Sequence, residues 1–205
     1  MAVGSETEEL RRSYTDTVRA LSNAVEARDA YTGKHAERVA AYGIEIARSL
    51  GLRVSEMHDL EFGFLLHDIG KVAIPDAILY KPGPLNDSER ALMEQHPVIG
   101  AEIIGGIGFL NKAAEVVRFH HERWDGRGYP DGLGGEEIPL AARVFAVGDA
   151  LDALTTDRPY RPRCPLSVAR QVITGEAGMQ FDPAVVRAFN SIDDRILDRI
   201  ATESR

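Results

Sequence analysis

Two adjacent pairs of side chains in this sequence have the chemistry of metal ligands. They are His67-Asp68 and His120-His121. Imidazole is the commonest metal ligand in proteins, and a carboxylate has two oxygens that can bridge two ions. Adjacent residues of a helix point about 100° apart, so a pair converges on one ion only where a helix ends or turns. Both pairs lie where the pattern predicts such an end, which favours a metal site, although His-Asp and His-His dipeptides also occur often by chance.

Two more residues are candidates for the same site. Asp149 follows the apolar run 144–147, and a buried carboxylate needs a partner because an unpaired buried charge is costly. A metal ion is one such partner. His96 precedes a proline and, taken alone, could equally be a structural cap. A single histidine among polar residues is usually a surface group, and we interpret His58 in this way.

The elements that must position these residues are helices. Apolar side chains recur at spacings of three and four over 10–25, which is one face of a helix. No segment alternates with period two, so we expect almost no sheet. The segments 75–87 and 124–139 are rich in proline and glycine and are predicted loops, the first with at most one short turn. The predicted helices are 7–28, 32 or 34 to 50, 55–67, 87–104, 110–121, 140–155, 166–174 and one that begins at Asp182.

Length and composition limit the class of protein. The 205 residues allow one domain, and 44% of them are apolar, which is enough for a core. Cys164 is the single cysteine, so a disulfide scaffold is excluded and a reducing compartment fits. No apolar run approaches the roughly 18 residues of a membrane span. Because the N-terminus is acidic where a signal peptide is apolar, we expect a cytoplasmic protein.

The charge excludes one class of partner. The formal net charge is −8, so the chain lacks the overall basic character of a protein that binds polymeric nucleic acid. An acidic protein that acts on phosphates must supply positive charge locally, through a metal ion or a few arginines and lysines.

Four motifs in fixed order carry a resemblance to a known family. They are LLHDIGK, HP, HHERWDGRGYP and VGDALDALTTDRPYR, with GKHAERV before and GMQFDP after them. Together they closely resemble the HD-GYP subfamily of the HD superfamily of metal-dependent phosphohydrolases, over about residues 20–190. The resemblance implies an all-α fold, a compact helical bundle of the HD-domain type with a Gly-rich GYP loop. We expect this catalytic domain over 14–190, a short tail and helix start over 1–13, and a helix end and tail over 191–205.

The resemblance also implies a set of metal ligands. In members that bind three metals, a glutamate stands four residues before an upstream histidine, and that position is Tyr31 here. We therefore expect two divalent transition-metal ions, most plausibly iron or manganese, and no third ion. Asp68 would bridge the two ions. The implied ligands are His67, Asp68, His96, His120, His121 and Asp149, with His35 as a further ligand in some members.

Substrate contacts follow from the same resemblance. Lys71 corresponds to the lysine that contacts the phosphate or the metal-bound bridging oxygen, and with Asp68 it forms the predicted catalytic pair. Outside the motif, Lys71 would be read as a surface lysine. Arg158 and Arg161 correspond to basic positions near the phosphates, although Arg161 often is lysine in the family. Ordinary ion pairs with nearby aspartates are the alternative for both arginines. The signature loop offers two further contacts, Gly128 and Tyr129.

The implied activity is that of a cyclic di-GMP phosphodiesterase. It would hydrolyse this bacterial signalling molecule to pGpG and on to GMP in some members, by attack of a metal-bridging hydroxide at a dinuclear site. Two divalent ions outweigh two aspartates and a hydroxide, so the centre would be cationic.

Alternatives to this activity and to a monomer stay open. The chain could hydrolyse another cyclic dinucleotide or a mononucleotide, although the GYP signature argues against the mononucleotide. It could also be a catalytically silent cyclic di-GMP sensor or interaction module. Possible partners are a second copy of the chain, through the helix face 10–25, and regulatory or diguanylate cyclase domains.

Overall fold

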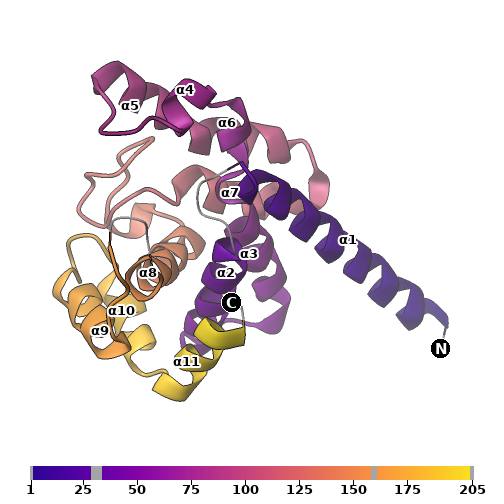
Figure 1. Ribbon diagram of the computed structural model, residues 1–205. Coiled ribbons are helices and arrows are strands. Elements are labelled where there is room, and N and C mark those ends of the chain that lie inside the picture. Colours follow the sequence, from indigo (N-terminus) through magenta and orange to yellow (C-terminus); the bar gives the residue numbers. More distant parts are fainter. Residues whose placement is uncertain (1, 29–33, 158–160, 204–205) are drawn as a thin grey trace.

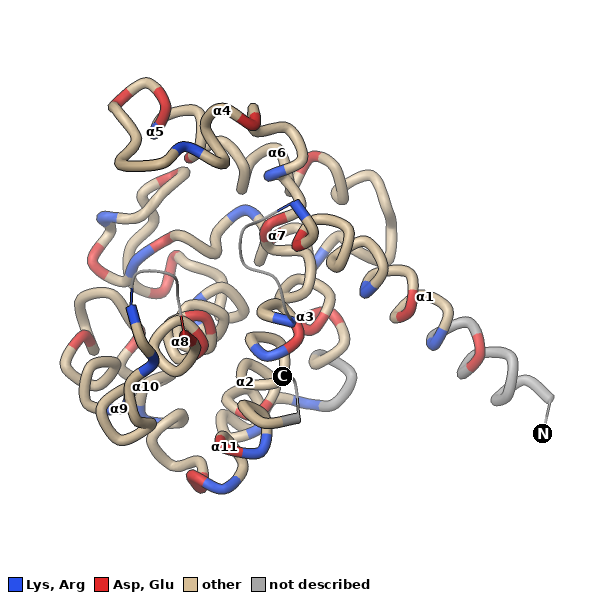
Figure 2. The backbone as a smooth tube through the Cα atoms, viewed as in Figure 1, with Lys and Arg blue, Asp and Glu red and all other residues tan. Residues whose placement is uncertain are grey.

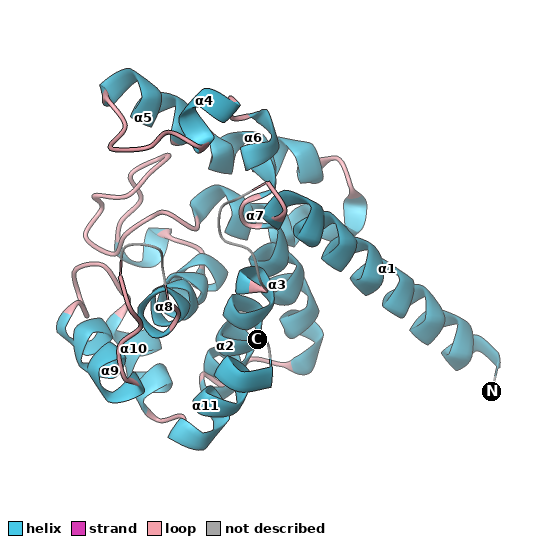
Figure 3. Ribbon diagram, in the orientation of Figure 1, coloured by secondary structure: helices cyan, strands magenta, loops and turns pink. Residues whose placement is uncertain are grey.

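The computed structural model describes residues 2–28, 34–157 and 161–203, and in these ranges it consists of helices joined by loops (Figures 1 and 3). Within them the structure has no strand, only two isolated bridges. The predicted all-α class is confirmed. The helices are α1 (Ala2–Glu26), α2 (His35–Ser49), α3 (Val54–Leu66), α4 (Asp76–Leu79), α5 (Asp87–Met93), α6 (His96–Gly105), α7 (Asn111–Phe119), α8 (Leu140–Thr155), α9 (Leu166–Gly175), α10 (Pro183–Asn190) and α11 (Asp194–Glu203). Three short 3-10 segments join them: η1 (Ile69–Ala73), η2 (Gly108–Leu110) and η3 (Gly135–Glu137).

The core lies where α2, α3, α7 and α8 pack on one another. Their apolar faces meet through fully buried side chains such as Ile46, Phe64, Val117 and Phe145. Burying an aliphatic or aromatic side chain contributes about 1.5–3 kcal/mol, so this contact region holds the ends of the four helices in fixed positions. His35, His67, His120 and His121 lie at these ends, Asp149 lies in α8, and His96 begins the neighbouring α6.

A close backbone contact sets η1 against α6. A Cβ on Gly70 would lie 1.9 Å from the carbonyl oxygen of His96 and 2.7 Å from the amide nitrogen of Gly100. Only glycine lets the two backbones approach to this distance. The contact brings the segment that begins with Asp68 next to the first turn of α6, where His96 lies.

The prediction of one helix over 87–104 is wrong. The structure has α5 and α6, separated at Glu94 and Gln95. Proline is tolerated in the first turn of a helix, but inside a helix it lacks an N–H donor and its ring clashes with the carbonyl four residues earlier. Pro97 therefore begins a new helix. The predicted start of α5 is confirmed, since the Asn86 side chain accepts from the Glu89 amide at 2.9 Å.

The ends of the chain are more helical than predicted. The helix expected from residue 7 begins at Ala2, and its first half extends away from the rest of the molecule (Figure 1). The single helix expected after Asp182 is divided into α10 and α11. The latter packs on α2, and its Leu197 is fully buried, so it belongs to the folded body.

The surface carries charges of both signs. Figure 2 shows basic and acidic residues interspersed along the described helices. None of the helices in the described ranges combines the length and the apolar composition needed to cross a bilayer.

Candidate metal centre

Three imidazoles are oriented by the C-terminal ends of α3, α5 and α7. At a helix end, backbone carbonyls lack an intrahelical partner, and here histidine Nδ1 atoms occupy these positions. Because Nδ1–H donates to a carbonyl, each Nε2 keeps its lone pair and faces the interior. Such a hydrogen bond from the other ring nitrogen is usual for a metal-binding histidine. The 2.8 Å contacts are His67 with Phe64 O, His96 with Met93 O, and His120 with Val117 O.

The Nε2 atoms of these histidines converge on Asp68. One carboxylate oxygen, Oδ2, lies 3.1 Å from His67 Nε2, and the other, Oδ1, lies 3.3 Å from His96 Nε2. His96 Nε2 and His120 Nε2 are 3.2 Å apart. Two lone pairs at this distance are favourable only when a proton or a cation lies between them. A ligand atom of His121 joins these two within 4.8 Å.

The protonation states suit metal binding. Burial lowers the pKa of His120 well below the ordinary value, and the neighbouring histidines lower it further. Burial likewise lowers the pKa of His121, to about 3. Burial opposes ionisation of Asp68, but the charges of His67 and Lys71 outweigh burial and hold its pKa well below the usual range. A neutral His120 and a neutral His121 beside an ionised Asp68 are the forms that bind metals, and nitrogen-rich donor sets suit first-row transition metals.

A fifth histidine approaches from α2. His35 is the first residue of this helix, and its ring centroid lies 5.5 Å from that of His67. His35 Nδ1 lies 2.7 Å from Asp152 Oδ2, and His35 Nε2 lies 3.5 Å from Asp149 Oδ1. Burial lowers the pKa of His35, whereas the hydrogen bond to Asp152 and the charge of Asp149 raise it by more, so the pKa lies above its ordinary value.

Asp152 is itself held by Arg38. Arg38 Nε donates to Asp152 Oδ1 at 2.5 Å, and Arg38 Nη2 donates to Oδ2 at 3.2 Å. Both side chains are buried. Neither residue was predicted from the sequence to belong to the site. The spacing held a signal: His35 and Arg38 are three apart on α2, as are Asp149 and Asp152 on α8, so each pair shares one helix face.

Lys71 lies at the edge of this cluster. Its Nζ is 2.8 Å from Asp68 Oδ2, across one turn of η1. It is partly buried beside Asp68 and is not an exposed surface lysine. The structure thus brings Lys71 together with the predicted metal-site residues of α2, α3, α6, α7 and α8.

The predicted loop over 124–139 covers His121. The Tyr129 ring stacks on the His121 ring, with centroids 4.6 Å apart. Burial raises the pKa of Tyr129. A Cβ on Gly128 would lie 2.5 Å from backbone atoms of His121, Glu122 and Arg123. Glycine at 128 therefore allows the loop to pack directly on the backbone of the histidine pair.

Glu122 anchors the same loop, and it was not among the residues predicted from the sequence to serve the site. It is 4% exposed. Its Oε1 accepts from the amides of Asp131 and Gly132 at 2.8 and 3.0 Å. Its Oε2 is buried without a hydrogen-bond partner. Burial raises the pKa of Glu122, and the backbone hydrogen bonds only partly offset this rise. Its position directly after His121 was the available signal.

Other predicted residues lie elsewhere or outside the described ranges. Arg161 is exposed, and its guanidinium donates to the carbonyl of Ala153 near the end of α8. Arg158 and Tyr31 fall outside the residues that the structure describes. His58 is partly exposed, with Nδ1 4.0 Å from Glu61 Oε2, away from the cluster, in line with its interpretation as a surface residue.

Comparison with known proteins places the chain in a family. A family model described as an HD domain matches residues 19–185. A cyclic di-GMP phosphodiesterase response regulator of Xanthomonas campestris pv. campestris is 42% identical over 190 residues, which is 92% of this chain and 50% of that protein. A 3'3'-cGAMP-specific phosphodiesterase of Vibrio cholerae is 41% identical over 180 residues, which is 87% of this chain and 34% of that protein. The chain thus spans half or less of the length of these relatives.

Solved structures show the same architecture. The crystal structure of a cyclic GMP-AMP specific phosphodiesterase of V. cholerae superimposes with a TM-score of 0.65 at 22% identity, over 91% of this chain and 52% of that one. At this identity the likeness establishes the fold. With the family model covering most of the sequence and the HD and GYP motifs built into one cluster, the chain belongs to the HD domain family, in its HD-GYP branch.

Proposed function

We propose that this chain hydrolyses cyclic di-GMP to pGpG and that it depends on metal ions. The observation that carries this proposal is the set of inward-facing Nε2 atoms around Asp68. Their lone pairs face one another and face a carboxylate, an arrangement that a metal ion between them would stabilise. The names of the relatives, which include cyclic di-GMP phosphodiesterases, supply the substrate class.

The metal ligands that we propose are the predicted ones: His67, Asp68, His96, His120, His121, Asp149 and His35. Two ions, iron or manganese, suit this donor set, since histidines outnumber carboxylates. When bound, such ions lower the pKa of a water molecule and neutralise charge on phosphate oxygens. Asp68 presents its two oxygens to different histidines, so a bridging position suits it.

The chain's own residues would orient the substrate. The Lys71 ammonium lies 2.8 Å from Asp68 and is a cation that a phosphate oxygen could share. Tyr129, stacked on His121, presents a ring and a hydroxyl at the wall of the centre. Arg161 is exposed near the C-terminal end of α8, and we propose a phosphate contact for it and for Arg158. The burial of the histidines excludes bulk water from the ligand atoms.

The test is anaerobic incubation of the purified chain with cyclic di-GMP and either Fe(II) or Mn(II), with chromatography of the products. Metal-dependent pGpG that disappears in Asp68→Ala would establish the activity, and later GMP would show a second cleavage. Intact cyclic di-GMP with a fully metallated protein would refute the proposal. A variant that loses turnover but still binds cyclic di-GMP tightly would separate catalysis from a sensor role.

A second candidate substrate is 3'3'-cGAMP. Its support is that relatives 36–41% identical to this chain are named as specific for this molecule. The same assay with both dinucleotides at equal concentration decides between them. Preference for cGAMP by tenfold or more in kcat/KM would replace the proposed substrate and leave the proposed chemistry intact. A homodimer, contacts with regulatory domains and a cytoplasmic location stay predictions.

A further inference from the structure

The helix that carries His35 begins without a cap of its own. Lys34 precedes it in the left-handed region, with φ 59° and ψ 25°, and makes no capping hydrogen bond through its side chain. The first amide groups of a helix need partners from outside the helix. The amide that needs such a partner belongs to Ala36, the residue next to His35. Asp152 holds the His35 ring itself through Nδ1.

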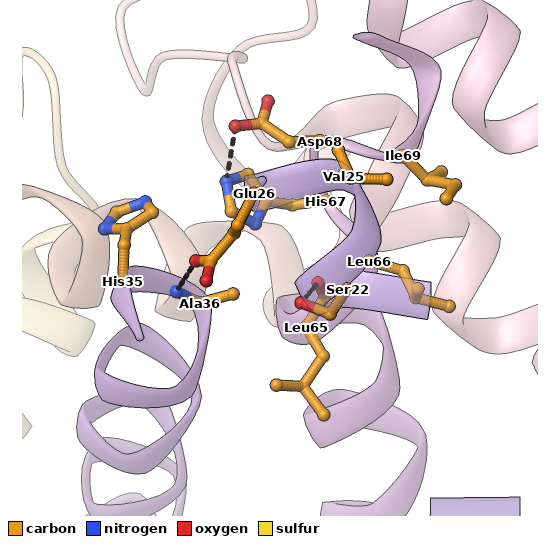
Figure 4. A pocket seen from close by; sticks show the side chains of 10 residues that line it. All are labelled: Ser22, Val25, Glu26, His35, Ala36, Leu65, Leu66, His67, Asp68 and Ile69. Carbon is orange, nitrogen blue, oxygen red and sulfur yellow. Dashed lines mark hydrogen bonds and ion pairs between the residues drawn. The ribbon is translucent and has the colours of Figure 1, made fainter. Parts of the chain in front are cut away.

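Glu26 supplies the missing cap from a different helix. Its Oε1 accepts from the Ala36 amide at 2.6 Å, as Figure 4 shows. Glu26 is the last residue of α1. A carboxylate at a helix N-terminus satisfies an amide donor and interacts favourably with the helix dipole. Glu26 therefore acts on α2 as an N-cap residue does, although it belongs to α1.

The end of α1 is also fixed to the segment that carries Asp68. Ser22 Oγ donates to the carbonyl of Leu65 at 2.7 Å, in the last turn of α3. Arg28 Nη1 donates to the carbonyl of Val72 at 2.9 Å, in η1. These contacts lie on both sides of His67-Asp68 in the chain. The end of α1 thus connects the start of α2 with the α3–η1 segment.

A small cavity lies between these elements. It measures about 20 Å³ and is lined by Glu26, His35, His67 and Asp68 together with apolar residues of α1 and α3. Figure 4 shows the Glu26 carboxylate between the rings of His35 and His67. Space for about one water molecule leaves room for the first turn of α2 to shift when the hydrogen bond to Ala36 is lost.

We propose that Glu26 is a positioning residue of the metal centre. It fixes the first turn of α2, so that His35 Nε2 faces Asp149 while His35 Nδ1 stays on Asp152. This inference rests on the metal centre of the proposed function and is independent of the identity of the substrate.

The experiment measures Mn(II) and Co(II) affinity of the purified chain by titration, with the Co(II) absorption spectrum as a second readout. The variants are Glu26→Ala, Glu26→Gln and His35→Ala, and the double variant Glu26→Ala/His35→Ala. Asn23→Ala, at an exposed position one turn before, is the matched control. Circular dichroism confirms that each variant is folded.

The expected pattern is specific to positioning. Glu26→Ala weakens metal affinity by about tenfold or more, as loss of an outer-shell partner does, and changes the Co(II) spectrum. Glu26→Gln stays within about twofold of wild type, because its amide oxygen still accepts from Ala36. Asn23→Ala has no effect. In the His35→Ala background, Glu26→Ala adds no further loss, since the group that Glu26 positions is absent.

Three results would overturn the inference. They are wild-type affinity in Glu26→Ala, equal losses in Glu26→Gln and Glu26→Ala, and an undiminished effect of Glu26→Ala in the His35→Ala background. Metal titration uses no cyclic dinucleotide. A chain that binds metal but leaves cyclic di-GMP intact would refute only the proposed activity, whereas a wild-type chain that binds no metal would refute both proposals.

Discussion

Replacing Asp152 by asparagine tests the support behind the metal centre without touching a proposed ligand. The Asp152 side chain is 3% exposed and that of Arg38 is 8% exposed, so the substitution leaves a guanidinium buried without its carboxylate. Removing one partner of a buried ion pair costs about 3–5 kcal/mol. Asparagine also cannot accept from His35 and Arg38 as a carboxylate does, because one of its two positions is a donor.

The expected loss of unfolding free energy is large relative to the total stability of a domain. Domains unfold with free energies of about 5–15 kcal/mol, so a loss of 3–5 kcal/mol lowers Tm by roughly 6–20 °C for a chain of this size. The assay is urea and thermal unfolding of the metal-free chain at pH 7, in chelator. Asp149→Asn is the matched control. Its side chain is 37% exposed and contacts His35 at 3.5 Å, so we expect a loss below about 1 kcal/mol.

The pH dependence gives the same prediction a second observable. Since the pKa of Asp152 is lowered in the fold, its contribution to stability is present above the unfolded pKa and is lost as pH falls through the folded pKa. Asp152→Asn should therefore flatten the acid limb of the stability curve. An unfolding free energy within 1 kcal/mol of wild type at pH 7 would refute the reasoning, because the ion pair would then contribute nothing.

Three further substitutions test the elements around the centre. Gly70→Ala should destabilise the chain by about 3 kcal/mol, because its Cβ would meet the backbone of α6. The control Gly105→Ala, with open space around the new Cβ, should not destabilise the chain. Equal Tm values for the two variants in thermal unfolding would contradict this. Glu122→Ala should cost about 1–3 kcal/mol for each amide of the loop that loses its acceptor and speed amide exchange over 128–134, with Glu122→Gln near wild type; unchanged exchange would count against the anchoring role. The pKa of His121 is lowered from 6.5 to about 3, so in the metal-free chain stability falls as pH drops below 6.5, by up to about 1.4 kcal/mol per pH unit for this group. His121→Asn should remove that slope from urea unfolding midpoints between pH 6.5 and 4.5, and parallel curves would disprove the assignment.

Four of the proposed histidine ligands lie at the ends of helices. His67 and His120 follow helix ends, and His96 and His35 begin helices. A helix end has backbone groups without an intrahelical partner, and a side chain there can hydrogen-bond to them. Ligands at such ends can converge on one point from several different helices. Residues inside helices can do so only where their helix faces pack against each other. This placement explains why adjacent pairs, which diverge inside a helix, can serve one centre here.

Much of this could be predicted from the sequence alone. Helical periodicity is a local property, so the all-α class followed from spacing. The order of the HD, HP, HH and GYP motifs indicated the cluster, and the structure brings those residues together. The missed break at Pro97 was also local: it divides the expected helix, and the carbonyl of Met93 then accepts from His96 Nδ1.

Other features depended on the tertiary structure. The hydrogen bond between His35 and Asp152 joins residues 117 positions apart. The cap that Glu26 provides joins α1 to α2, and the hydrogen bonds of Glu122 hold a loop about ten residues further along the chain. The need for glycine at 70 arises from the backbone of α6 and from nothing in its own segment. Spacing along a chain determines which side chains share a helix face, whereas only packing decides which faces meet and which buried groups find partners.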